Sequence, residues 1–160
     1  MRLHPLTREL AADLARGDLS AVRASNLAEA GESLREVGKA YADFYDRTPS
    51  APPWIGYLAE DESSGKIVGS CGYKGDCRDA MVEIAYFSFP PYERRGFGRE
   101  MARLLTDLAL DQPVVQIVRA HTLREENASV RILRRLGFVL FGTVEDPDDG
   151  PVWRWDLERR

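Results

Sequence analysis

The residues that bear most directly on chemistry lie in one short segment. Positions 90–100 read Pro-Pro-Tyr-Glu-Arg-Arg-Gly-Phe-Gly-Arg-Glu. Gly96 and Gly98 permit backbone angles that expose consecutive amides, and a helix beginning there adds free N–H groups and the positive end of its dipole. Such a turn binds phosphate oxygens, and full charges surround it on Arg94, Arg95 and Arg99. Taken alone, the segment is equally compatible with a tight glycine turn whose arginines are solvated.

Two familiar phosphate-binding loops do not match this segment. A dinucleotide-binding fingerprint needs a third small residue three positions after Gly98, where Met101 stands. A nucleoside-triphosphate loop needs Gly-Lys followed by Ser or Thr, which is absent from the sequence.

Hydrophobic periodicity predicts the elements that must position the segment. Strands are expected at residues 1–6, 54–59, 66–73, 81–89, 114–122, 138–144 and 151–157. Helices are expected between Thr7 and Gly17 and at residues 32–47, 98–110 and 127–136. The glycine segment thus joins the end of one strand to the start of a helix, and strand 114–122 has the continuous apolar character of a strand buried on both faces. Strand, helix and strand in succession indicate a mixed α/β sheet with at least one right-handed crossover.

Composition limits the classes of partner. The chain has 160 residues, a length typical of one domain, and 22 Lys and Arg against 26 Asp and Glu give 22 − 26 = −4 at neutral pH. That charge disfavours nucleic acid as a partner. The apolar runs fall far short of the ~20 residues of a membrane span, and the first ten residues lack an apolar signal core, so we expect no membrane partner and a cytoplasmic location. Cys71 and Cys77 with two histidines make a metal site hard to build, and no metal is expected.

Two further motifs accompany the glycine segment. Residues 82–87 read Val-Glu-Ile-Ala-Tyr-Phe before it, and Asn-Ala-Ser at 127–129 precedes Leu-Arg-Arg-Leu-Gly-Phe at 133–138. Together the motifs resemble the GNAT superfamily of acetyl-CoA-dependent N-acetyltransferases, most of all the branch that includes the ribosomal-protein N-terminal acetyltransferases. The likeness covers residues 54–160 as an acetyl-CoA-binding core. Residues 1–50 would be the variable first strand and helices of a single N-acetyltransferase domain, 1–160.

The resemblance implies a fold of the α/β (α+β) class: a mixed, mostly antiparallel sheet of six to seven strands, flanked by about four helices, with the two central strands, 81–89 and 114–122, splayed apart. It implies that the glycine turn holds the coenzyme A pyrophosphate through the amides of Arg94, Arg95, Gly96, Phe97, Gly98 and Arg99. It also implies that the strand edge at Phe87, Ser88 and Phe89 pairs with the pantetheine arm like an added strand. Asn127 would contact the pantetheine or begin its helix.

Three positions depart from the family pattern. Glu93 replaces the Gln or Arg that the family places three before the first glycine, and we expect its acidic side chain to point to solvent. Leu133 stands where the family often has a tyrosine that acts as general acid. Counted back from Gly137, the family's Asn falls on Glu126, so that Asn127 is one place out of register.

Acetyl transfer to an amine needs a neutral nucleophile, and Glu83 is the candidate base that would provide it, directly or through water. Its side chain shares a strand face with apolar neighbours, which predicts a raised pKa for the carboxyl group. A solvated carboxylate, or one paired with arginine, is the alternative. A backbone N–H near Phe87 or Ser88 would polarise the thioester carbonyl.

Ser129 is the candidate donor of a proton to the coenzyme thiolate, as the resemblance suggests for chains without the tyrosine. A helix-start hydroxyl that bonds the backbone is the alternative. His121, at the end of a central strand, could face the same cleft, although a structural hydrogen-bonding role is more common for such a histidine. A plain helix cap is likewise the alternative for Asn127.

The sequence therefore favours an N-acetyltransferase that moves an acetyl group from acetyl-CoA to a primary amine by direct attack in a ternary complex. A non-catalytic acyl-CoA-binding module of the same fold is the alternative, and an interaction protein that uses exposed aromatics of helix 32–47 is a third possibility. The amine could belong to a protein N-terminus or a small molecule; acidic residues at 146, 148 and 149 are compatible with a cationic one. The C-terminal hairpin could pair across a homodimer.

Overall fold

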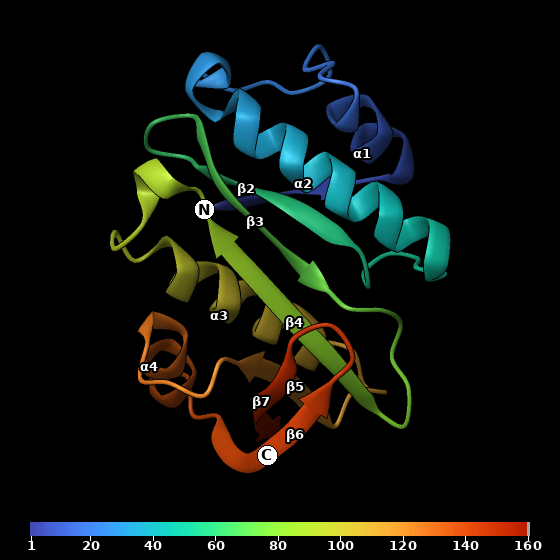
Figure 1. Ribbon diagram of the computed structural model, residues 1–160, viewed down its shortest axis with the longest axis vertical. Coiled ribbons are helices and arrows are strands. Elements are labelled where there is room, and N and C mark those ends of the chain that lie inside the picture. Colours follow the sequence, from blue (N-terminus) through green and yellow to red (C-terminus); the bar gives the residue numbers. More distant parts are fainter. Residues whose placement is uncertain (160) are drawn as a thin grey trace.

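The computed structural model describes residues 1–159, which form one seven-stranded sheet and four α-helices (Figure 1). The strands are β1 Arg2–Leu6, β2 Gly56–Asp61, β3 Lys66–Tyr73, β4 Met81–Ser88, β5 Ile117–Thr122, β6 Val139–Asp146 and β7 Gly150–Glu158. The helices are α1 Arg8–Ala15, α2 Leu27–Arg47, α3 Phe97–Leu110 and α4 Ala128–Arg135, with a short 3₁₀ helix, η1, at Pro90–Tyr92. The expected mixed α/β class is confirmed.

The sheet has the strand order β1-β2-β3-β4-β5-β7-β6, and its one parallel pair is β4 with β5. Those two strands pair only where Met81–Glu83 face Ile117–Arg119. Beyond that point they separate, while β4 stays paired with β3 as far as Ser88. The expected splay of the central strands is therefore confirmed. It leaves residues 84–88 with one backbone edge that faces the gap.

The helices form two groups. In Figure 1, α1 and α2 pack together in front of β2 and β3, whereas α3 lies behind β4 with α4 beside it. Leu34 and Val37 of α2 enter the core from the first group, and Met101 and Leu105 of α3 enter it from the second. Burial of these amphipathic stripes, more than helix propensity, fixes the helices on the sheet.

Two element boundaries differ from the sequence-based expectation by three residues or more. Helix α2 begins at Leu27 and not at residue 32, because the buried side chain of Asn26 anchors its start to β3: it donates to the Ile67 carbonyl at 2.9 Å and accepts from the Ile67 amide at 3.0 Å. Strand β5 begins at Ile117, since Val114 is exposed. Burial in β5 alternates along the strand, so the expectation of burial on both faces is wrong.

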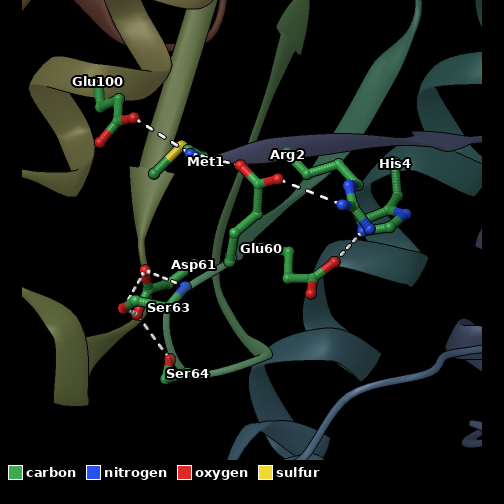
Figure 2. A network of polar contacts seen from close by, with 9 residues as sticks. Met1, Arg2, His4, Glu60, Asp61, Ser63, Ser64 and Glu100 are labelled. Atoms are coloured by element: carbon green, nitrogen blue, oxygen red, sulfur yellow. Dashed lines mark hydrogen bonds and ion pairs between the residues drawn. The ribbon is translucent and has the colours of Figure 1, made fainter.

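Charged contacts tie the edge strand β1 to its surroundings (Figure 2). The Met1 ammonium lies 2.9 Å from a carboxylate oxygen of Glu62 and 3.3 Å from one of Glu100, in the first turn of α3. His4 and Glu60 form a second pair at 2.5 Å between Nε2 and Oε2. The contact with Glu100 connects the edge of the sheet to the helix that begins at the glycine segment, and the pair of His4 and Glu60 joins β1 to β2.

Helices α1 and α2 approach closely at Gly38, which gives a test of the packing. A Cβ added there would lie 2.5 Å from Leu14 Cβ and 2.5 Å from the Ala15 amide nitrogen. We expect Gly38→Ala to lower the free energy of unfolding by about 1–3 kcal/mol, measured by urea denaturation, because the helices must separate. Gly31→Ala in the same helix is the control: its Cβ would make an ordinary 3.6 Å contact with Leu19 Cδ1. The control should gain about 0.5–1 kcal/mol from reduced backbone entropy, and equal stability of both variants would contradict this packing.

Candidate functional site

The corner between β4 and α3 presents free backbone amides. Arg94 has a φ of +61° and Gly96 a φ of +88°, so the chain turns sharply before α3 begins at Phe97. The first helical hydrogen bond runs from the Glu100 amide to the Gly96 carbonyl. Among the described residues, no group accepts a hydrogen bond from the backbone amides of residues 94–99. This corner is therefore a set of unsatisfied donors at the positive end of a helix.

The corner borders a cavity of about 750 Å³, here called the larger cavity, that extends to α4. Glu93 is the one acidic residue that lines it, and as expected it is exposed. Four arginines line it: Arg94, Arg99, Arg131 and Arg135. Within residues 1–159, none of the four has a carboxylate oxygen within 4.0 Å. The cavity is thus strongly electropositive in a chain whose net charge is −4, and it suits a polyanion.

The predicted coenzyme-binding residues divide into two groups. Those that line the larger cavity are Phe87, Ser88, Arg94, Gly96, Gly98 and Arg99. The side chains of the other three in this stretch lie elsewhere. Phe89 is fully buried and donates its amide to the Val68 carbonyl, while Arg95 and Phe97 pack near the Tyr92 ring, at 5.7 Å and 6.3 Å from its centroid.

Helix α4 supplies two arginines that were not predicted from the sequence. Arg131 and Arg135 face the larger cavity from one side of the helix, and their spacing of four residues, opposite the buried Val130 and Leu133, is a signal that could have found them. Asn127 caps the helix, since its Oδ1 accepts a hydrogen bond from the Val130 amide at 3.0 Å. Asn127 also lines the neighbouring, smaller cavity.

The smaller cavity, of about 350 Å³, lies in the gap between β4 and β5. Glu83 and His121 face each other across it, with 2.9 Å between Oε1 and Nδ1. Lys74, before β4, places its ammonium 3.3 Å from Glu83 and 3.9 Å from Asp146. The turn between β6 and β7 adds Asp149 to the wall. The cavity is therefore lined by a carboxylate-rich cluster around one ammonium and one imidazole.

The surroundings of Glu83 differ from the expected apolar face. Burial pushes the pKa of the Glu83 carboxyl upward, but the hydrogen bond with His121 and the charge of Lys74 outweigh it, so that the pKa lies below its usual value. The expectation of a raised pKa is wrong. Glu83 is an ionised carboxylate at neutral pH, paired with a histidine and a lysine.

Tyr86 and Ser129 line both cavities and mark the point where the two cavities meet. The Tyr86 hydroxyl is buried and, among the described residues, has no hydrogen-bond partner. Burial raises the pKa of Tyr86 to about 12, against the opposing influence of the neighbouring Ser129 hydroxyl. A buried phenol that keeps its proton and lacks an acceptor is a donor in need of a ligand.

This unsatisfied hydroxyl predicts an unusual effect of its removal. Tyr86→Phe should raise the free energy of unfolding of the ligand-free protein by about 1 kcal/mol, because a desolvated donor without a partner is removed while the ring remains. Thermal or urea denaturation measures this change. Tyr45→Phe, which removes a hydroxyl bonded to the Leu6 carbonyl and the Gly56 amide, should be destabilising instead. A loss of stability in both variants would contradict the conclusion that the Tyr86 hydroxyl has no hydrogen-bond partner.

Comparison with known proteins agrees with this geometry. A family model described as an acetyltransferase (GNAT) domain matches residues 1–139. The chain belongs to the GNAT acetyltransferase family. A curated relative from Bacillus subtilis (strain 168), named uncharacterized N-acetyltransferase YjdG, is 32% identical over 76 residues, which make up 47% of this chain and 45% of the relative. The match thus spans less than half of that relative's length.

Solved structures of GNAT proteins share the fold. The aminoglycoside acetyltransferase AAC(6')-Ib in complex with coenzyme A has a TM-score of 0.69 and 19% identity, with coverage of 98% of this chain and 94% of that one. RimL, a ribosomal alpha-N-protein acetyltransferase in complex with coenzyme A, has a TM-score of 0.65 and 12% identity, with coverage of 98% and 92%. The expected resemblance to the ribosomal-protein acetyltransferases is therefore confirmed at the level of the fold.

Two further observations concern residues 1–159 as a whole. They contain no helix that is long and apolar enough to cross a membrane. They also contain no group of three or more His, Cys, Asp or Glu side chains placed to hold a metal ion.

Proposed function

We propose that this GNAT protein is an acetyl-CoA-dependent N-acetyltransferase that moves an acetyl group to a primary amine. The observation that carries the proposal is the meeting of two cavities of opposite character at Tyr86 and Ser129, inside the gap between β4 and β5. One cavity is basic and suits phosphates, and the other is rich in carboxylates and suits an ammonium. Because the cavities are distinct but share two lining residues, both substrates can be bound side by side, which supports direct transfer.

The residues of the larger cavity fit acetyl-CoA. The free amides of residues 94–99 and the arginines Arg94 and Arg99 suit its pyrophosphate, and Arg131 and Arg135 add positive charge on the opposite wall. The unpaired backbone edge of residues 84–88 suits the pantetheine amides. The orphaned Tyr86 hydroxyl offers a further donor. Bound there, acetyl-CoA supplies an activated acetyl group as a thioester.

The chain's own groups divide the remaining chemistry. The backbone N–H of Ser88, which the register turns away from β3, would polarise the acetyl carbonyl, and the Ser129 hydroxyl, at the junction, would give a proton to the departing sulfur. Glu83 has an indirect role in removing the proton from the acceptor. Because its own pKa is low, it accepts a proton from an ammonium poorly, and it serves the reaction through the groups it contacts.

The acceptor that the smaller cavity favours is a cation. Against the effect of burial, Glu83, Asp146 and Asp149 raise the pKa of the Lys74 ammonium. Glu83 and Asp149 line the cavity, so its carboxylates outnumber its one fixed cation. Both a protein N-terminus and a small-molecule amine meet this requirement. The two free cysteines, one of them buried, support the reducing, cytoplasmic location that the sequence predicts.

Calorimetry followed by a thiol-release assay tests the proposal. Acetyl-CoA should bind the protein at micromolar concentrations, and a panel of α-amines, polyamines and aminoglycosides should contain an acceptor that releases free coenzyme thiol. Absence of binding at millimolar acetyl-CoA would contradict the assignment. Binding without thiol release from any amine would identify the protein as a non-catalytic acyl-CoA-binding module.

A further inference from the structure

A histidine–carboxylate pair lies in the smaller cavity. His121 is on β5 and Glu83 on β4, at the point where the two strands stop pairing. Glu83 pairs in register with Arg119, so His121 lies beyond the last paired position, where the gap opens. Both side chains are largely but not fully buried, with exposed fractions of 17% and 19%. They are therefore accessible from the cavity but shielded from bulk solvent.

The hydrogen bond fixes the protonation pattern of the histidine. The ionised Glu83 carboxylate accepts only, so His121 donates to it from Nδ1–H across 2.9 Å. In the neutral imidazole the lone pair then lies on Nε2. No described residue forms a hydrogen bond with Nε2. The cavity therefore contains an imidazole whose Nδ1–H is held by the Glu83 carboxylate and whose Nε2 has no hydrogen-bond partner among the described residues.

The charged groups around His121 come from several elements. Glu83 faces it from β4, and Lys74 holds the same carboxylate from the preceding loop. The Asp146 carboxylate, at the end of β6, accepts hydrogen bonds from the amides of Asp149 and Asp148, which lower its pKa most, and the charges of Lys74 and His121 lower that pKa further. Arg154 is the register partner of His121 on β7, but its guanidinium is bound to Asp156. Carboxylates thus outnumber unpaired cations around the His121 ring.

We infer that His121 is the general base for the acceptor and that Glu83 is the residue that positions it; this inference rests on the proposed function. The acceptor ammonium gives one proton to Nε2: its N–H bond breaks, the electron pair stays on the amine nitrogen, and an Nε2–H bond forms. The neutral amine nitrogen then forms a bond with the acetyl carbonyl carbon, and the carbon–sulfur bond of the thioester breaks. Of the three ammonium protons, one stays on the amide, one leaves with the coenzyme sulfur as a thiol, and one returns from His121 to water.

The first test needs neither acetyl-CoA nor an acceptor. The chain has two histidines, so the ¹⁵N chemical shifts of the imidazole nitrogens can be assigned with His121→Gln. We expect His121 to be protonated on Nδ1 in the neutral form, and Glu83→Gln to redistribute the proton between the two nitrogens. The pair of His4 and Glu60 offers a matched control outside both cavities: Glu60→Gln should leave the His121 signals unchanged. A neutral His121 protonated on Nε2 would overturn the inference.

The second test follows the rate. His121→Gln should lower kcat/KM for an amine acceptor by about a hundredfold at pH 7, because a positioned base contributes that much or more, and Glu83→Gln should lower it by about tenfold. The deficit should shrink as pH rises past the pKa of the acceptor amine, which then needs no base. A merely structural role would give a deficit that does not depend on pH. His4→Gln should keep the wild-type rate.

Calorimetry with acetyl-CoA separates failure of this inference from failure of the proposed function. The variants His4→Gln, His121→Gln and Glu83→Gln should bind acetyl-CoA with affinity within about twofold of wild type, since none of the three residues lines the larger cavity. The role of His121 alone would be refuted if wild-type protein binds acetyl-CoA and transfers the acetyl group, while kcat/KM of His121→Gln is unchanged or is lowered equally at every pH. Wild-type protein that binds no acetyl-CoA would refute the proposed function.

Discussion

Replacing Gly98 with aspartate is expected to lower the affinity for acetyl-CoA by about a hundredfold or more, because unfavourable juxtaposition of like charges costs several kcal/mol. A Cβ at this position would point between β4 and α4, 3.5 Å from Ser88 Oγ and 3.4 Å from Ile132 Cδ1. The new carboxylate would thus enter the larger cavity beside the free amides of the corner. Calorimetric titration of acetyl-CoA into Gly98→Asp measures the loss.

The same substitution should not unfold the protein. An aspartate in the first turn of α3 interacts favourably with the helix dipole, by about 0.3–1 kcal/mol, and Ile132 Cδ1 is the end of a flexible side chain that can shift. We therefore expect the melting temperature of ligand-free Gly98→Asp to equal or exceed that of wild type. Gly98→Ala is the matched control, with the same Cβ and no charge, and its affinity should fall by less than about tenfold. An unchanged affinity of Gly98→Asp for acetyl-CoA would mean that the phosphates bind away from this corner.

The double variant Arg131→Ala/Arg135→Ala should weaken acetyl-CoA binding by about a hundredfold, since hydrogen bonds to charged groups contribute roughly 1.5–3 kcal/mol each. Both arginines lie on the α4 side of the larger cavity and have no carboxylate within 4.0 Å among the described residues. Because the effect is electrostatic, the difference in affinity between wild type and variant should narrow at high salt. Calorimetry at two ionic strengths measures it.

Arg134 provides the matched control on the same helix. Its guanidinium is bound to Glu126 at 2.6 Å and does not line the larger cavity. Arg134→Ala removes one positive charge from the same helix, yet the affinity for acetyl-CoA should change by less than about threefold. An equal loss of affinity in Arg134→Ala and in the double variant would mean that binding of acetyl-CoA depends on the net charge of α4 and not on the positions of its arginines.

Most of the fold could be predicted from local signals. The expected strand at residues 66–73 matches β3, and the helix expected between Thr7 and Gly17 is α1, whose start the Thr7 hydroxyl caps. The helix expected at residues 127–136 is α4, and Gly137, with a φ of +89°, follows its end. The main boundary error lies at α2, whose start depends on Asn26 bonding to β3 more than 40 residues away. A contact between distant segments leaves no trace in local periodicity.

The candidate site could be predicted only in part, because it too depends on contacts between distant segments. The glycine corner is contiguous in sequence, so its amides and nearby arginines could be placed from the segment itself. The surroundings of Glu83 were predicted from neighbours on its own strand, whereas its carboxylate is held by His121 on the adjacent strand. Pairing across a sheet depends on register, which periodicity alone does not set. The buried hydroxyl of Tyr86 likewise depends on how α3 and α4 close over β4.

The short contact between β4 and β5 also has a mechanical consequence. Three residue pairs join the four strands on one side to the three strands on the other, at the end of the gap away from the mouth. Beyond that contact no backbone pairing holds the two parts of the sheet together, so the width of the mouth depends on side-chain packing, including that of α3 against β3, β4 and β5.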